Sequence, residues 1–282
     1  MNPKPRGSCL LDAQKRLSVR RKAVTVAIGM YGVGGVFVCA DSHVISGDGT
    51  VTWGTKVKGR GSSNGSFVIA NAADDGNAAD MLAEEILDAL TNTRGELGAS
   101  VKKTMKTWHA GYVHSKPPSI QFVLGVVVGK SRGLYFCEPP NTVLLKNLDE
   151  HVAIGVGAEI IDPLAPEVIR GPLVLREALI RAAYLMYRAK KQHAFLKGSD
   201  THALVVSTET GEIRSVDVEE TRAAEAIGPD VDFMLRYCYL GLLGTPRNID
   251  QTDFLKSFSH SYLEKRSKID AVQFPSIPFA MT

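Results

Sequence analysis

The sequence is poor in cysteine, and its few cysteines are far apart. The chain of 282 residues has four, with no Cys-x-x-Cys pair: Cys9, Cys39, Cys137 and Cys238. This spacing argues against a disulfide framework and against a cysteine-rich zinc site. Reduced thiols fit better, so we expect a cytoplasmic protein.

Long apolar runs and common catalytic motifs are also missing. No run approaches the roughly 20 residues of a membrane helix, so no membrane partner is expected. The sequence has no P-loop, His-Glu-x-x-His, EF-hand loop or Gly-x-Ser-x-Gly elbow. Gly32-Val-Gly-Gly35 lacks the dinucleotide spacing and is better explained as a hairpin turn. The seven histidines are scattered. We therefore expect neither a metal nor another cofactor.

Positive charge is concentrated at the N-terminus. Residues 1–24 contain one acid, Asp12, and seven bases: Lys4, Arg6, Lys15, Arg16, Arg20, Arg21 and Lys22. The rest of the chain is slightly acidic, which makes nucleic-acid binding a poor interpretation because it would depend on this arm alone. The arm could be a solvated terminus, a mitochondrial-type leader or a removable pro-segment.

The remainder has an ordinary globular composition, with 44% hydrophobic and 22% charged residues. Its pattern predicts strands and helices in alternating groups. Strands are expected at 25–31, 36–40, 52–58, 66–71, 121–129, 133–137, 143–146, 152–156, 202–207 and 213–218. Helices are expected from 77, over 97–108, over 158–170 (interrupted or shortened by Pro163 and Pro166), from 172 to 193, over 231–243 and over 254–266.

Paired helices between groups of strands disfavour a doubly wound parallel sheet. They favour an α+β fold in which antiparallel sheets have helix pairs packed outside them. We divide the chain into a basic arm (1–24), a main domain (25–218) and a C-terminal helical extension packed on that domain (219–282).

One constellation carries chemistry. Thr25 opens the first strand, Asp41 ends its hairpin partner, and Lys56 lies on the next strand. Hairpin geometry can bring the start of one strand beside the end of the other. A threonine hydroxyl needs a base to become nucleophilic, and a free α-amino group can act as that base. A nearby ammonium lowers the pKa of the hydroxyl, and a carboxylate holds the ammonium in place. Lys58 is the alternative lysine.

These residues and their spacing resemble the proteasome β-subunit and HslV family of N-terminal-nucleophile hydrolases. The match extends over about residues 25–218 and has three parts: Thr25-Val-Ala-Ile-Gly…Gly35-Val-Phe-Val-Cys-Ala-Asp41-Ser42, Ile69-Ala-Asn71-Ala-Ala73-Asp-Asp75 and Ala153-Ile-Gly-Val-Gly157. The resemblance implies a four-layer αββα sandwich of two antiparallel sheets flanked by helix pairs.

The resemblance also implies a threonine peptidase. Residues 1–24 would be removed, Thr25 would attack the peptide carbonyl, and Lys56 and Asp41 would tune it. The backbone N–H of Asn71 would receive the oxyanion. Peptides or unfolded proteins would be substrates, homo-oligomers in rings or related assemblies would form, and an unfoldase is a possible partner. Val44, Ile69 and Ala73 fall at specificity-pocket positions, which implies an apolar pocket.

Several positions depart from the family pattern. Val24 precedes the threonine where the family has glycine, Asn71 replaces the glycine of the oxyanion turn, and Val156 replaces a serine. The aspartate that supports the threonine is missing near 193–199, and Asp200 is out of register. These departures leave a second hypothesis open: a catalytically inactive structural or scaffold subunit that keeps its basic arm.

Overall fold

A computed structural model describes residues 25–45, 51–93, 95–148, 150–169, 171, 173–243, 261 and 263–275, without the side chains of 51 and 236–243. Strands occupy Val26–Gly32 (β1), Gly35–Asp41 (β2), His43–Ile45 (β3), Val51–Trp53 (β4), Val57–Ser62 (β5), Gly65–Ala73 (β6), Ile120–Val128 (β7), Ser131–Glu138 (β8), Thr142–Leu145 (β9), His151–Gly155 (β10), Thr201–Ser207 (β11) and Ile213–Val216 (β12).

Helices lie between these groups of strands. They are Gly76–Asn92 (α2), Leu97–Ala110 (α3), Ala158–Val168 (α4), Leu175–Gln192 (α5), Val218–Ala226 (α6) and Gly228–Leu243 (α7), with a short 3-10 turn at Ala194–Leu196 (η1). Residues 263–271 are also helical. No helix in the described part of the chain is long and apolar enough to cross a membrane.

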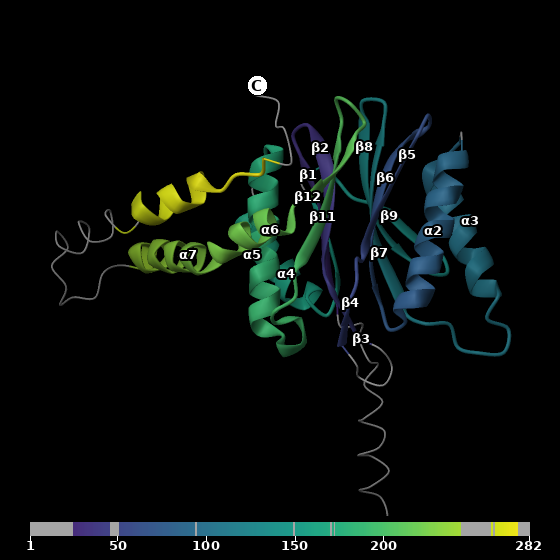
Figure 1. Cartoon of the computed structure of the whole chain (residues 1–282), viewed down its shortest axis with the longest axis horizontal. Coiled ribbons are helices and arrows are strands. Elements are labelled where there is room, and N and C mark those ends of the chain that lie inside the picture. The colour runs from purple at the N-terminus through teal and green to yellow at the C-terminus, as the bar shows by residue number, and fades with distance from the viewer. Residues whose placement is uncertain are drawn as a thin grey trace, which may run out of the picture.

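The strands form two antiparallel sheets, as expected. One has the order β10-β1-β2-β11-β12, the other has the order β5-β6-β7-β8-β9, and β3 and β4 make a separate hairpin. Helices α2 and α3 cover the outer face of the second sheet, while α4, α5 and α6 lie outside the first (Figure 1). The protein is therefore an α+β four-layer αββα sandwich, which confirms the predicted fold class.

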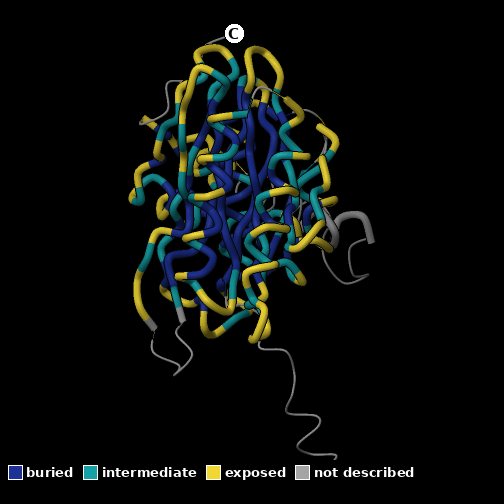
Figure 2. Tube along the Cα trace, turned by 90° about the vertical axis from the view of Figure 1, so that its right-hand side faces the viewer, coloured by how far each residue is buried: buried dark blue, intermediate teal, exposed yellow. Residues whose placement is uncertain are grey.

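Three apolar layers hold the sandwich together. Strand residues such as Val38 and Val68 fill the space between the sheets, and separate clusters lie beneath each helix pair. Because both faces of each sheet are covered, β1 and β2 are buried along their full length and lack the in–out alternation of a half-exposed sheet. Figure 2 shows the resulting buried interior surrounded by exposed loops.

The segment after residue 218 contacts the first sheet's helical layer. Val272 and Phe274 are buried in the same cluster as α4 and α5, and the Arg176 side chain donates to the carbonyl of Val272. Residues 1–24, and residues 254–260 of the predicted last helix, lie outside the described residues. The proposed division into arm, main domain and extension stays a prediction.

Candidate active site

Thr25 lies immediately before β1, between the ends of the two sheets. Only 3% of its surface is exposed. Its carbonyl faces the segment between β10 and α4, where the N–H of Gly157 donates to it over 3.5 Å. Gly155 adopts a positive φ of 78°, and a Cβ added there would lie 2.1 Å from the Thr25 carbonyl oxygen. A glycine is thus needed at 155 to let the backbone approach Thr25 this closely.

Asp41 stands beside Thr25 because of the hairpin register. Ala27 pairs with Ala40, which puts the start of β1 opposite the end of β2. The N–H of Val26 donates to Asp41 Oδ1 at 2.8 Å, and the N–H of His43 donates to Oδ2 at 3.0 Å. The carboxylate is completely buried. Its two oxygens are each held by a backbone amide, so its position is fixed by the main chain.

Lys56 connects the acid to the threonine. Its Nζ lies 2.8 Å from Thr25 Oγ1 and 3.1 Å from both oxygens of Asp41. Burial lowers the pKa of the Lys56 ammonium, and the charge and hydrogen bonds of Asp41 oppose that shift without cancelling it. The structure therefore brings together three of the residues selected from the sequence, in hydrogen-bonding contact.

The alternative lysine is directed elsewhere. Lys58 Nζ lies 3.0 Å from Glu84 Oε1 and 3.7 Å from Asp80 Oδ1, both on α2. Lys56 lies immediately before β5, where it reaches Thr25, whereas Lys58 is the second residue of β5. Of the two candidates, Lys56 is the one in contact with Thr25.

Asn71 lies nearby on β6, but its backbone N–H is engaged. It donates to the carbonyl of Lys56 at 3.2 Å, which continues the β5–β6 ladder by one residue. Its side-chain Nδ2 donates to Asp80 Oδ1 at 3.2 Å. An oxyanion at this N–H would have to share or displace the Lys56 carbonyl. The oxyanion role of Asn71 thus stays a prediction.

The segment expected to support the threonine from behind makes other contacts. The Asp200 carboxylate accepts from Arg222 Nε at 2.8 Å, and this bond lowers the pKa of Asp200. The main chain of Asp200 exchanges hydrogen bonds with Ser42, whose Oγ accepts from the Asp200 N–H at 3.0 Å. Asp200 therefore ties β11 to the end of β2 through its backbone and does not replace the missing acid.

A cavity of about 230 Å³ opens beside Thr25. Of the expected pocket residues, Val44 and Ala73 line it, whereas Ile69 is buried under α2. The wall is largely polar, which does not fit the apolar pocket implied by the sequence. Its lining consists of Thr25, Val44, Thr52, Gly54, Thr55, Lys56, Asn71, Ala73, Gly76, Asn77 and Asp80.

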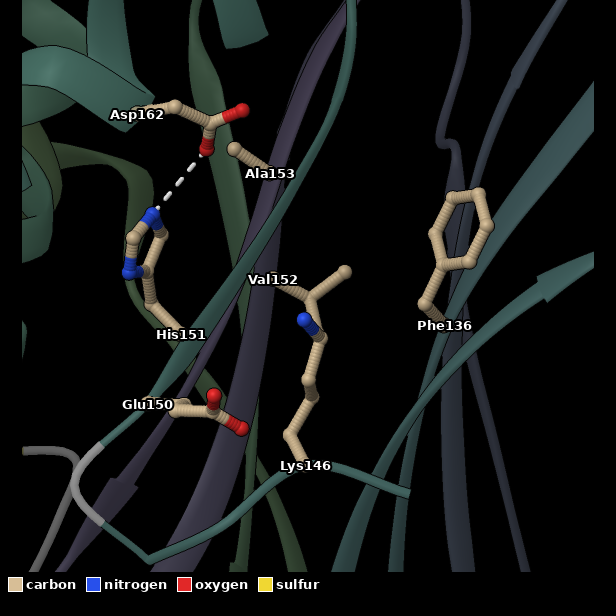
Figure 3. Close-up of a pocket in the computed structure, with 7 residues that line it drawn as sticks. All are labelled: Phe136, Lys146, Glu150, His151, Val152, Ala153 and Asp162. Atoms are coloured by element: carbon tan, nitrogen blue, oxygen red, sulfur yellow. Dashed lines mark hydrogen bonds and ion pairs between the residues drawn. The ribbon is translucent and has the colours of Figure 1, made fainter. Parts of the chain in front are cut away.

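A second cavity, of about 290 Å³, lies at the other end of β10 (Figure 3). His151 Nε2 and Asp162 Oδ1 lie at a hydrogen-bonding distance of 3.1 Å there, and Lys146 and Glu150 complete the polar side. Its lining includes no serine, threonine or cysteine. This cavity lacks a hydroxyl or thiol nucleophile, so the Thr25 cavity is the better candidate. Among the described residues, no three His, Cys, Asp or Glu side chains gather closely enough to hold a metal.

Sequence reasoning missed two features of the site. One is the bond from the His43 N–H to Asp41, and the other is Asp80 on the cavity wall. The first had a local signal, because an aspartate that accepts the N–H two residues later is a common Asx-turn. The second had no local signal, since Asp80 reaches the site only through the packing of α2 on β6.

The fold has known relatives among solved structures. The Gly-1 mutant of Anbu from Hyphomicrobium sp. strain MC1 shares 16% identity with a TM-score of 0.63, over 78% of this chain and 100% of that chain. Anbu, the ancestral beta-subunit, from Yersinia bercovieri shares 12% identity with a TM-score of 0.62, over 80% and 99%. The helical assembly of the Anbu complex from Pseudomonas aeruginosa shares 16% identity with a TM-score of 0.63, over 79% and 98%.

Neither a family model nor a curated protein matches the sequence of this chain. The structural matches, at these low identities, establish a proteasome-like fold. They correct the sequence-based resemblance at the level of the family: the solved structures named above are Anbu proteins, rather than the proteasome β-subunits or HslV that the motifs suggested.

Proposed function

We propose that this protein is a threonine-type peptidase that uses an N-terminal nucleophile. The main support for this proposal is the buried contact of Thr25 Oγ1 with Lys56 Nζ at 2.8 Å, beside an open cavity. Removal of residues 1–24 would give Thr25 a free α-amino group. That amine would take the hydroxyl proton, directly or through a water, as Oγ1 attacks the carbonyl carbon of a bound peptide.

Lys56 and Asp41 have distinct roles in this proposal. The Lys56 ammonium donates to Thr25 Oγ1 and stabilises the alkoxide that develops there. Asp41 is held by the Val26 and His43 amides and fixes Lys56 in reach of the hydroxyl. Water would then cleave the acyl-enzyme ester and restore the threonine. The leaving amine takes up the proton that the α-amino group removed.

A structural subunit without activity is the second candidate. It is favoured by the engaged N–H of Asn71 and by the turning of Asp200 towards Arg222. An oxyanion would have to compete for the Asn71 N–H, and Asp200 does not supply the aspartate that the family pattern has behind the threonine.

Assembly and location belong to the proposal as well. The Pseudomonas aeruginosa Anbu is described as a helical assembly, and we extend self-assembly to this chain, as a ring or a related form. Peptides or unfolded proteins would be the substrates. Buried, unpaired Cys39 and Cys137 fit a cytoplasmic location.

The intact mass of the purified full-length protein tests the proposed nucleophile. We expect wild type to lose residues 1–24 and Thr25→Ala to keep them. Thr25→Ser should still lose them, because it retains a hydroxyl, but more slowly than wild type. Full-length mass in wild type would favour the structural subunit. Identical loss in Thr25→Ala would indicate cleavage by another protease.

A further inference from the structure

The cavity beside Thr25 has the size of one side chain. Its volume of about 230 Å³ lies below the roughly 300–1,000 Å³ typical of sites for whole small molecules. Thr25 and Lys56 are at one wall, and the first turn of α2 forms another. A group entering this cavity would therefore be attached to something lying outside it, such as a peptide backbone.

The N-terminal part of α2 brings a carboxylate to the cavity. Gly76, Asn77 and Asp80 all line it, as their separations of three and four residues place them on one helix face. Asp80 is 47% exposed. Its Oδ1 accepts from Asn71 Nδ2 at 3.2 Å and lies 3.7 Å from Lys58 Nζ. Oδ2 has no hydrogen-bond partner among the described residues.

The neighbouring cations are better compensated than Asp80. Lys56 is paired with Asp41 at 3.1 Å. Lys58 is closer to Glu84, at 3.0 Å, than to Asp80, and the bond from Lys58 lowers the pKa of Glu84. The positive end of α2 is capped by the Asp75 side chain, which accepts from the Ala78 N–H. Asp80 thus shares Lys58 with Glu84 and keeps Oδ2 without a partner among the described residues, so it is the carboxylate at the cavity that can accept a further cation.

We propose that Asp80 makes this cavity a binding site for a cationic side chain, lysine or arginine, of a peptide laid against Thr25. Oδ2 accepts a hydrogen bond from the ammonium or guanidinium, and Val44 and Ala73 contact its apolar stem. This inference rests on the proposed function, because it identifies the cavity as the pocket for the residue whose carbonyl Thr25 attacks. It replaces the neutral, apolar specificity suggested by the sequence.

Equilibrium binding separates this inference from catalysis. The full-length Thr25→Ala protein removes the nucleophile, and a labelled, N-acetylated peptide amide ending in arginine serves as the probe. The matched probe ends in citrulline, which is nearly isosteric but neutral. We expect the arginine peptide to bind about 10-fold more tightly by fluorescence anisotropy, the range of a charge-assisted hydrogen bond.

Two further variants locate the effect. Adding Asp80→Asn to Thr25→Ala should abolish the preference for arginine. Adding Asp88→Asn should preserve it, because Asp88 pairs with Arg60 and does not line the cavity, while Glu84 still holds Lys58. Equal binding of the two peptides, binding of neither, or an arginine preference that survives Asp80→Asn would overturn the proposal. The proposed function is tested separately by intact mass, and it fails if the wild-type protein keeps residues 1–24.

Discussion

At the scale of single residues, the site depends on a buried charge pair. Asp41 is fully buried and Lys56 is 6% exposed, and the carboxylate also receives two backbone amides. Removing one member of such a pair leaves the other charge without compensation. Two opposed effects therefore set the proton affinity of Lys56: burial, which lowers its pKa, and Asp41, which raises it.

Asp41→Asn should lower the pKa of Lys56 further, because the opposing charge is lost while burial remains. A pH titration followed by NMR of ¹³Cε-labelled lysine measures this directly. Glu84→Gln is the control, since it alters the surroundings of Lys58 and leaves Lys56 untouched. An unchanged or raised Lys56 pKa in Asp41→Asn would contradict the assignment.

The sign of the accompanying stability change follows from linkage. Lys56 has a lower pKa in the folded protein than in the unfolded chain, so between those two values the unfolded chain binds more protons. The contribution of this group to the free energy of unfolding therefore rises with pH across that window. Asp41→Asn widens the window at its lower end, so the rise should begin at a lower pH.

At the scale of elements, packing decides several boundaries. Helix α4 runs through both Pro163 and Pro166, where the sequence predicts an interruption or a shorter helix. Ile161 and Ala165 bury their side chains in the core beneath it, and tertiary packing compensates for backbone bonds that proline cannot make.

The predicted strand over 52–58 is divided between β4 and β5. Helix α6 was missed, although Asp217 at its N-cap and Glu219 and Glu220 in its first turn are a typical start.

The close approach of β10 to Thr25 gives a test at this scale. Gly155→Ala should destabilise the protein by about 1–3 kcal/mol more than Gly198→Ala, measured by urea unfolding. Both glycines have a similar positive φ, 78° and 82°, so both variants carry the same conformational penalty. Only at Gly155 does the added Cβ meet another atom, the Thr25 carbonyl oxygen; at Gly198 nothing lies within 4 Å. Equal destabilisation would show that the contact with Thr25 is unimportant.

At the scale of the whole molecule, the sandwich places the site at one end of both sheets. Thr25 precedes β1 and Asp41 ends β2 of the first sheet, Lys56 precedes β5 and Asn71 lies on β6 of the second, and α2 adds the cavity wall. No single layer contains the site, so it exists only when the two sheets pack together. Binding at the cavity should then stabilise the whole fold rather than one element.

Self-assembly is the prediction that belongs to this scale. A single chain has a mass of 30.5 kDa. Sedimentation velocity of the purified protein should reveal species several times heavier whose proportion falls on dilution, as mass action requires. The Thr25→Ala variant is the control, and it should assemble equally if assembly does not require cleavage. A single species of one chain at all concentrations would contradict the proposed homo-oligomer.

The sequence by itself determined the alternation of strand groups with helix pairs, the hairpin of β1 and β2, and the neighbourhood of Thr25 and Asp41. These follow from local periodicity, turn residues and strand pairing, which act over short stretches of chain. Only the tertiary structure decided that Lys56 rather than Lys58 reaches Thr25, that the Asn71 N–H is engaged, and that Asp80 lines the cavity. Each of these depends on how two elements distant in sequence pack against each other, which local patterns do not encode.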